Sequence, residues 1–212
     1  MGYHRAGFDV VGIDIKPQPR YPFPFIQADA LKPPVDLKAF DVIHASPPCQ
    51  AFTALKSMWN SREHPELVEP TRKMLIESGK PWIMENVVGA PLINPMVLCG
   101  TMFGLTTEDQ RAELRRHRLF ESRDVFALLP PCQHNAPMVI GVYGGHGRDR
   151  RRSVGVYGHA GGKSVRDGAQ QFSTKQRSEA MGIKWMTGNE LSQAIPPAYT
   201  EFIGRQLLSS IK

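Results

Sequence analysis

Four short apolar runs alternate with polar or helical segments in the first part of the chain, and each run leads into a polar or reactive residue. The runs cover residues 10–13, 25–27, 40–45 and 82–84 and lead into Asp14, Asp29, Ser46–Cys49 and Glu85. Runs of this length, bounded by turn residues, are typical of strands in a parallel α/β sheet. Because ligands bind outside the carboxyl ends of such strands, we expect the four ends to converge on one crevice.

Two segments have helical periodicity. Residues 65–78 place large apolar side chains on one side and are followed by Gly79, a residue that commonly ends helices, so a crossover helix is predicted between the third and fourth strands. Residues 197–211 repeat this periodicity at the end of the chain. The polar residues 51–64 predict a loop that closes over a bound substrate.

The alternation of strands and helices gives way after about residue 122 to Pro- and Gly-rich sequence. Two Gly-Val-Tyr-Gly repeats, at residues 141–144 and 155–158, flank a run of arginines and predict a small β ribbon that presents positive charge. We therefore divide the chain into a catalytic domain (1–121), a β-rich insertion (122–172) and a C-terminal return to the catalytic domain (173–212).

The composition, 41% apolar and 22% charged, is that of a globular protein rather than a disordered or fibrous one. No apolar run approaches the roughly 20 residues that a membrane span needs, and the first residues lack the apolar core of a signal peptide. We therefore expect a cytoplasmic protein without a membrane partner. The net charge of +6 suits a polyanionic partner, although many ordinary proteins reach this value.

Three cysteines, Cys49, Cys99 and Cys132, are widely spaced along the chain. This spacing predicts neither a disulfide framework nor a Cys-x-x-Cys zinc site, and the histidines lack metal-ligand spacing, so no metal is expected. Pro130-Pro131-Cys132-Gln133 repeats the tetrapeptide around Cys49, but no clear strand precedes it. We therefore expect Cys49 to be the reactive thiol and Cys99 to be buried and inert.

Cys49 and Glu85 follow successive strands that are separated by the crossover helix. A thiolate beside a proton donor is what addition to carbon 6 of a pyrimidine requires, because protonation of the ring nitrogen neutralises the developing charge. Carbon 5, once activated, can take a methyl group. Each feature has a simpler interpretation when it is taken without the others. Cys49 is then a structural residue, Glu85 a solvated charge or a cap, and the charged run 111–118 a solvated face.

Four motifs, in order, resemble those of the DNA cytosine-5 methyltransferases. Ser46-Pro-Pro-Cys49-Gln50, Glu85-Asn86-Val87 and Arg116-His-Arg118 are similar to the family's Pro-Cys-Gln, Glu-Asn-Val and Gln-x-Arg-x-Arg motifs. Residues 192–197, Ser-Gln-Ala-Ile-Pro-Pro, resemble its Gly-Asn-Ala-Val-Pro-Pro segment. The resemblance spans nearly the whole chain, with Leu114 where the family usually has Gln and Gln193 where it has Asn.

The resemblance implies a Rossmann-like, mostly parallel S-adenosyl-L-methionine (AdoMet) domain that acts on a cytosine flipped out of duplex DNA. By this resemblance Cys49 attacks carbon 6, Glu85 engages the ring nitrogen, and Arg118 holds the base carbonyl while Arg116 orders the site. The residues it implies for AdoMet are Asp14, Ile15, Asp29, Ala30, Pro48 and Gln193. Those it implies for DNA are Ser46, Gln50, Asn86, Arg148, Arg150, Arg151 and Arg152.

The family begins with a strand and a Phe-x-Gly-x-Gly turn that cradles the methionine end of AdoMet, and Met1 aligns just beyond that turn. The resemblance therefore implies an N-terminal truncation of about one strand. It also implies a compact bacterial or phage enzyme of DNA methylation, of the kind found in restriction–modification, which we expect to be a monomer.

Three alternatives stay open at the level of sequence. The first is a remnant that binds DNA without turnover. The second is a related enzyme that places a group other than methyl on cytosine. The third is an enzyme of the thymidylate synthase type, which pairs its cysteine with a following His, whereas Gln50 follows here.

Overall fold

The computed structural model describes residues 1–52, 64–125, 129, 131–136, 138–142 and 172–211, and its architecture is α/β. The chain forms two compact units. The first unit consists of residues 1–2, 99–116 and 129–201, and the second unit of residues 3–98, 117–128 and 202–212.

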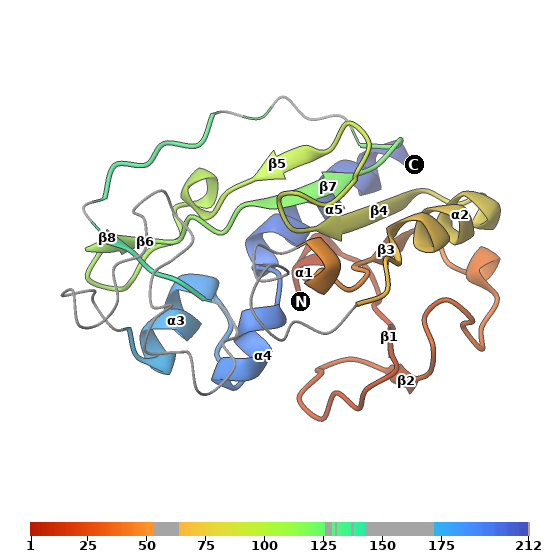
Figure 1. Ribbon diagram of the computed structural model, residues 1–212, viewed down its shortest axis with the longest axis horizontal. Coiled ribbons are helices and arrows are strands. Elements are labelled where there is room, and N and C mark those ends of the chain that lie inside the picture. The colour runs from red at the N-terminus through yellow and green to blue at the C-terminus, as the bar shows by residue number, and fades with distance from the viewer. Residues whose placement is uncertain (53–63, 126–128, 130, 137, 143–171, 212) are drawn as a thin grey trace. The chain divides into compact units, whose positions relative to one another are not determined.

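The larger sheet of the second unit has four strands in the order β3-β4-β7-β5 (Figure 1). Its strands are β3 (Ile43–Ala45), β4 (Trp82–Asn86), β7 (Arg118–Glu121) and β5 (Met96–Leu98). β3 and β4 are parallel, whereas β7 is antiparallel to both of its neighbours. The sheet is therefore mixed, where the sequence predicts a mostly parallel one, because the chain leaves at the end of β5 and returns in the opposite direction along β7.

The predicted strands before Asp14 and Asp29 form a separate sheet. β1 (Gly12–Asp14) pairs in parallel with β2 (Phe25–Gln27), with Asp14 opposite Gln27. Among the described residues, β1 pairs only with β2, and β3 pairs only with β4. The expected parallel strands are thus present, but they lie in two sheets rather than one.

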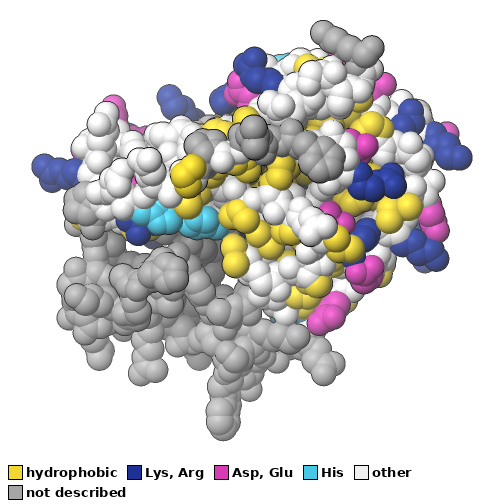
Figure 2. All heavy atoms as spheres, turned by 90° about the horizontal axis from the view of Figure 1, so that it is seen from above, with side chains coloured by type: hydrophobic (Ala, Val, Ile, Leu, Met, Phe, Trp, Pro, Cys, Tyr) yellow, Lys and Arg dark blue, Asp and Glu magenta, His cyan; other side chains and the backbone are white. Residues whose placement is uncertain are grey.

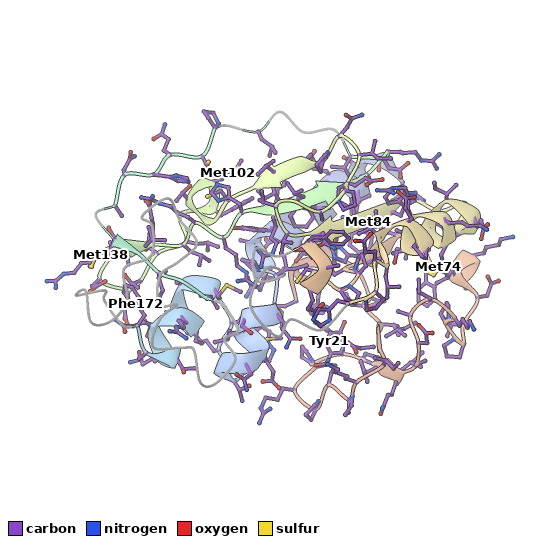
Figure 3. The ribbon with its side chains drawn as sticks, in the orientation of Figure 1. Tyr21, Met74, Met84, Met102, Met138 and Phe172 are labelled. Atoms are coloured by element: carbon purple, nitrogen blue, oxygen red, sulfur yellow. The ribbon has the colours of Figure 1, made fainter. Side chains whose placement is uncertain are left out.

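The crossover helix predicted between the third and fourth strands is α2 (Val68–Ser78). Gly79 ends it with φ of 68°, a left-handed conformation that costs glycine little, and donates its N–H to Ile76 O. The buried side of α2 packs on β4, where Met74 and Met84 are labelled in Figure 3. The fully buried members of this core are Val68, Leu75, Trp82 and Met84, each contributing on the order of 1.5–3 kcal/mol through burial.

The predicted C-terminal helix is confirmed as α5 (Pro197–Ser210), in which Tyr199, Ile203 and Leu207 are fully buried. The short helical turns of residues 1–52 were not predicted, since three to five residues carry no readable period. They are α1 (Gly2–Ala6), η1 (Leu37–Ala39) and η2 (Gln50–Phe52).

The first unit has its own apolar core, built from two helices and two short parallel strands. These elements are β6 (Ala112–Glu113), β8 (Met138–Val139), α3 (Thr174–Met181) and α4 (Gly188–Gln193), with η4 (Gly100–Phe103) beside them. Ser173 and Thr187 begin α3 and α4 with capping boxes. Met138 and Phe172, labelled in Figure 3, pack against the buried cluster that contains Leu114.

Several sequence predictions fall outside the described residues. Residues 53–63, which make up most of the predicted substrate-closing loop, lie outside the described residues, and so do residues 143–171. Only Gly141 and Val142 of the two Gly-Val-Tyr-Gly repeats are described, so the ribbon and the boundaries of the 122–172 insertion stay predictions. Within the described part of the chain, no helix combines the length and apolar character that crossing a membrane requires.

Candidate active site

The loop that carries Cys49 is tied to the end of β4 by Asn86. Asn86 Nδ2 donates to the carbonyl oxygen of Pro47 at 3.0 Å, and Asn86 Oδ1 accepts from the N–H of Val87 at 2.9 Å. The Asn86 side chain is almost fully buried, and Pro47 is buried with it. The sequence motifs around Cys49 and Glu85 therefore meet directly, as parallel pairing of β3 with β4 requires. This contact gives Asn86 a positioning role, and its predicted contact with substrate stays a prediction.

Cys49 lies where the chain turns from this loop into η2. It is partly buried, and its carbonyl oxygen accepts a hydrogen bond from the N–H of Phe52 at 2.9 Å. None of the three cysteines forms a disulfide. Ser46, Pro48 and Gln50 are exposed around it, as residues that touch a substrate or cofactor would be.

Glu85 is held by an ion pair with Arg118. Arg118 Nε lies 3.1 Å from Glu85 Oε1, and the two side chains are only 13% and 9% exposed. Glu85 faces Phe120 in the antiparallel register, so Arg118, two residues along β7, is its diagonal neighbour on the same face. Arg118 also donates from Nη1 to His117 O at 2.8 Å. These contacts use two of the five guanidinium N–H groups, so Arg118 can orient Glu85 and still donate to a base carbonyl.

Arg116 belongs to the first unit and is 2% exposed, so it is not part of a solvated charged face. Its Nη1 donates to Val142 O, and its Nη2 donates to Ser192 O at 2.7 Å. The hydroxyl of Tyr199 donates to the carbonyl oxygen of Arg116 at 2.7 Å. Arg116 thus fastens residue 142 to the backbone next to Gln193, the last and exposed residue of α4, which is a positioning role.

A hydrogen-bonded chain behind the Cys49 loop was not foreseen from the sequence. Tyr3 Oη lies 2.7 Å from His44 Nδ1, and His44 Nε2 lies 3.0 Å from Ser46 Oγ. Burial lowers the pKa of His44 to about 4 and raises the pKa of Tyr3, to which the charge of Glu85 adds. Both groups are therefore neutral near pH 7. No local pattern links residues 41 positions apart, so only folding could reveal this chain.

The lowered pKa of His44 predicts a loss of stability in mild acid. The unfolded state takes up a proton near pH 6.5 and the folded state only near pH 4, so the free energy of unfolding falls as the pH drops through this window. Urea titrations at several pH values measure the free energy of unfolding, and the variant His44→Gln serves as the comparison. The variant should lose less stability than the parent between pH 6.5 and pH 4; parallel curves would contradict this assignment.

The proposed cofactor residues lie at the ends of β1 and β2. Asp14 Oδ1 accepts from Lys16 N at 2.8 Å and Asp14 Oδ2 from Gln18 Nε2 at 3.3 Å, while Asp29 Oδ1 accepts from Leu31 N at 2.9 Å. A carboxylate can accept about four hydrogen bonds, so both retain capacity for ligand hydroxyl or amine groups. Ile15 is 66% exposed, and Ala30 is exposed as well. Carboxylates beside an uncovered apolar side chain fit a ribose and an adenine ring.

The arginines predicted to contact DNA, Arg148, Arg150, Arg151 and Arg152, lie outside the described residues. On the face drawn in Figure 2, Lys and Arg side chains are interspersed with Asp and Glu among apolar groups. The charge pattern of this face therefore does not by itself mark a surface for phosphates.

The comparisons with known proteins add no family to this description. A scan against protein-family models finds no match to the sequence, and a search of curated proteins finds no similar chain.

Proposed function

We propose that this protein is an AdoMet-dependent DNA cytosine-5 methyltransferase with Cys49 as nucleophile and Glu85 as its acid partner. One observation carries the proposal. Asn86 ties the Cys49 loop to the end of β4 at 3.0 Å, directly beside Glu85, which Arg118 holds at 3.1 Å. A thiol and an oriented carboxyl group on adjoining strand ends are the two groups that addition to a pyrimidine needs.

In the proposed reaction, Cys49 Sγ forms a bond to carbon 6 while the electrons of the C5–C6 double bond move toward carbon 5 and the ring. Glu85, in its carboxylic acid form, gives its proton to the ring nitrogen and so neutralises the charge that develops there. Carbon 5 then takes a methyl group, whose bond to the sulfonium sulfur of a bound AdoMet would break and leave a neutral thioether. Loss of the proton from carbon 5 to water or another base restores the double bond and expels the Cys49 thiolate, and the ring nitrogen returns its proton to Glu85.

The chain's own residues support part of an AdoMet site. AdoMet, when bound, supplies an electrophilic methyl group. Asp14 at the end of β1 would accept hydrogen bonds from ribose hydroxyls, and Asp29 beyond β2 from the adenine amine. Ile15 offers an exposed apolar surface for the ring, and Pro48 is a further residue of the second unit assigned to this ligand.

The outer edges of β1 and β3 lead to a prediction about AdoMet affinity. β1 and β3 are each hydrogen-bonded on one edge only within the described residues, so a strand that paired with both would join the two sheets. We expect calorimetry to detect tighter AdoMet binding by a chain to which such a strand is added at the N-terminus than by the chain of 212 residues.

Asp14→Ala in the extended chain is the control, and it should weaken binding, because the ribose hydroxyls would lose their acceptor. Binding by neither form would contradict the cofactor assignment and favour a remnant that binds DNA without turnover. Double-stranded DNA as partner, a monomeric state and a cytoplasmic setting belong to the same proposal. The identity of the transferred group is read directly from the mass of the product nucleoside.

A further inference from the structure

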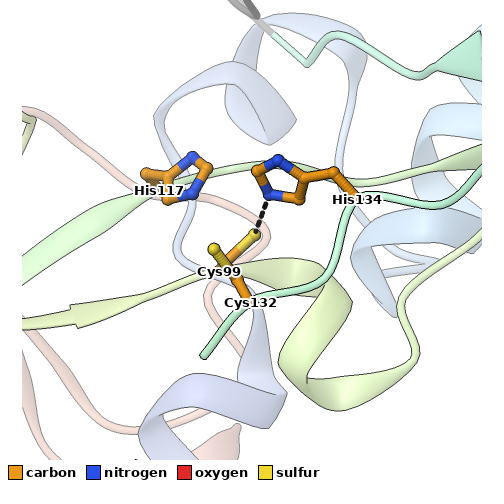
Figure 4. Close-up of side chains that lie close together, drawn as sticks. All are labelled: Cys99, His117, Cys132 and His134. Atoms are coloured by element: carbon orange, nitrogen blue, oxygen red, sulfur yellow. Dashed lines mark hydrogen bonds between the residues drawn. The ribbon is translucent and has the colours of Figure 1, made fainter. Parts of the chain in front are cut away.

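We propose that Cys99, His117, Cys132 and His134 form a metal site for zinc. One potential ligand atom from each residue lies within 4.8 Å of the others, and Figure 4 shows the four side chains directed toward one another. Cys99 Sγ lies 3.5 Å from His134 Nε2. The sequence led us to expect no metal, since the four residues are spread over 36 positions without a recognisable spacing. The inference does not depend on the proposed methyltransferase activity.

The ligand set has the chemistry and the spacing of a structural zinc centre. Zinc in such centres takes four tetrahedral ligands, and two cysteines with two histidines are among its commonest sets. With zinc–ligand bonds of 2.0–2.3 Å, neighbouring ligand atoms lie about 3.3–3.8 Å apart. Ligand atoms within 4.8 Å of one another therefore need to move only slightly to close on an ion. Four protein ligands leave no open position, so the metal would be structural rather than catalytic.

The backbone places Cys99 and His117 opposite each other. Leu98 at the end of β5 faces Arg118 at the start of β7, so Cys99 and His117 are the next pair in the antiparallel register. His117 directly precedes Arg118 in the chain and Cys99 directly follows Leu98, so both ligands extend paired strand ends. Strand pairing and chain continuity alone thus bring these two ligands together.

Cys99 is held firmly on its other side. Gly100 lies so close to the backbone of Leu114 that a Cβ atom there would be 2.1 Å from Leu114 O, so only glycine fits. Thr101 Oγ1 lies 3.2 Å from Cys99 Sγ, where its hydroxyl can donate to a metal-bound thiolate. The N–H of Cys99 donates to Met102 Sδ at 3.3 Å. Cys99 therefore has a fixed orientation before any metal binds.

The segment with Cys132 and His134 is anchored by Glu113, a residue of β6 that is 5% exposed. Its Oε2 accepts from the N–H groups of Asn135 at 3.2 Å and Ala136 at 3.0 Å. Burial raises the pKa of Glu113, but hydrogen bonds from Ala136 and Arg115 outweigh it and leave the pKa below its usual range. The carboxylate of Glu113 thus anchors the backbone that directly follows His134.

Two other roles fit these residues less well. A disulfide between Cys99 and Cys132 would use the two sulfurs and leave the convergence of both imidazoles unexplained. A nucleophilic cysteine–histidine pair needs an accessible sulfur, whereas Cys99 is fully buried. A zinc ion, by contrast, binds all four side chains. It takes the cysteines as thiolates and the histidines as neutral imidazoles, so it accounts for the presence of both residue types in one site.

The test is the zinc content of the full chain, purified without chelator and measured by inductively coupled plasma mass spectrometry. We expect one zinc ion per chain, and its loss in Cys132→Ser and in His134→Asn. Cys49→Ser and His64→Asn are matched controls, since Cys49 is also partly buried and His64 is also exposed, and both should retain zinc. Cobalt substitution should give visible d–d bands and a thiolate charge-transfer band in the parent chain and in the two controls, but not in Cys132→Ser or His134→Asn.

His134 is exposed, so His134→Asn should fold, and circular dichroism checks that its zinc loss is not unfolding. Chelation of the metal should lower the Tm of the parent chain and leave the Tm of His134→Asn unchanged. The proposal is overturned by a folded parent chain without zinc, by zinc that the four variants retain equally, or by a Cys99–Cys132 disulfide in protein purified from reducing cytosol.

Discussion

Replacing Cys49 with alanine is expected to abolish exchange of the hydrogen on carbon 5 of cytosine. Addition of the thiolate to carbon 6 makes carbon 5 basic, so a protein that forms the adduct releases tritium from carbon 5 into water. Removing the nucleophile of an enzyme lowers the rate on the order of 10⁴-fold or more. Because this exchange precedes methyl transfer, it tests Cys49 without AdoMet, and scintillation counting of the released tritium measures it.

A second experiment, with AdoMet present, decides between the two Pro-Pro-Cys-Gln sequences. In DNA that carries 5-fluorocytosine, methyl transfer would leave fluorine on carbon 5 where a proton must depart, so the adduct should stay bound and be recovered in a peptide that contains Cys49. Recovery of the adduct on Cys132, or full exchange by Cys49→Ala, would refute the assignment. Cys49→Ala should still bind DNA, which separates loss of the nucleophile from loss of the fold.

Replacing Glu121 with alanine is expected to destabilise the protein by about 3 kcal/mol, because the guanidinium of Arg72 loses its buried carboxylate and keeps only the exposed carboxylate of Glu69 and the carbonyl oxygen of Pro91. Arg72 Nε lies 2.7 Å from Glu121 Oε1 and Arg72 Nη2 lies 2.8 Å from Glu121 Oε2, with both side chains 6% exposed. The hydrogen bonds with Glu121 raise the pKa of Arg72, so it cannot lose its charge in compensation. Urea denaturation followed by circular dichroism measures the change.

Glu77→Ala is the matched control. Helix α2, which carries Arg72, also carries an exposed ion pair in which Lys73 Nζ lies 3.8 Å from Glu77 Oε1. An exposed pair contributes about 0–1 kcal/mol, so this variant should unfold nearly like the parent. An equal loss of unfolding free energy in the two variants would show that burial does not decide how much an ion pair contributes to stability. Because Glu121 ends the strand that begins with Arg118, its loss should also weaken the support of Glu85.

The local pattern of the sequence determined the elements that need only their own residues. The runs before Asp14, Asp29 and Glu85 are strands, α2 ends at Gly79, and a helix closes the described chain, because apolar periodicity and end signals act over a few positions. Ordered motifs likewise singled out Cys49, Glu85 and Arg118, of which Glu85 and Arg118 are in contact.

Tertiary structure alone decided the contacts between distant parts of the chain. The antiparallel place of β7 depends on the path between β5 and β7, which no local period encodes. Strand register and buried partners also set two side-chain clusters. One is the series of hydrogen bonds from Tyr3 through His44 to Ser46, and the other is the cluster of Cys99, His117, Cys132 and His134. Spacing along the sequence could not reveal these clusters, because pairing between strands, and not separation along the chain, sets the distances between their side chains.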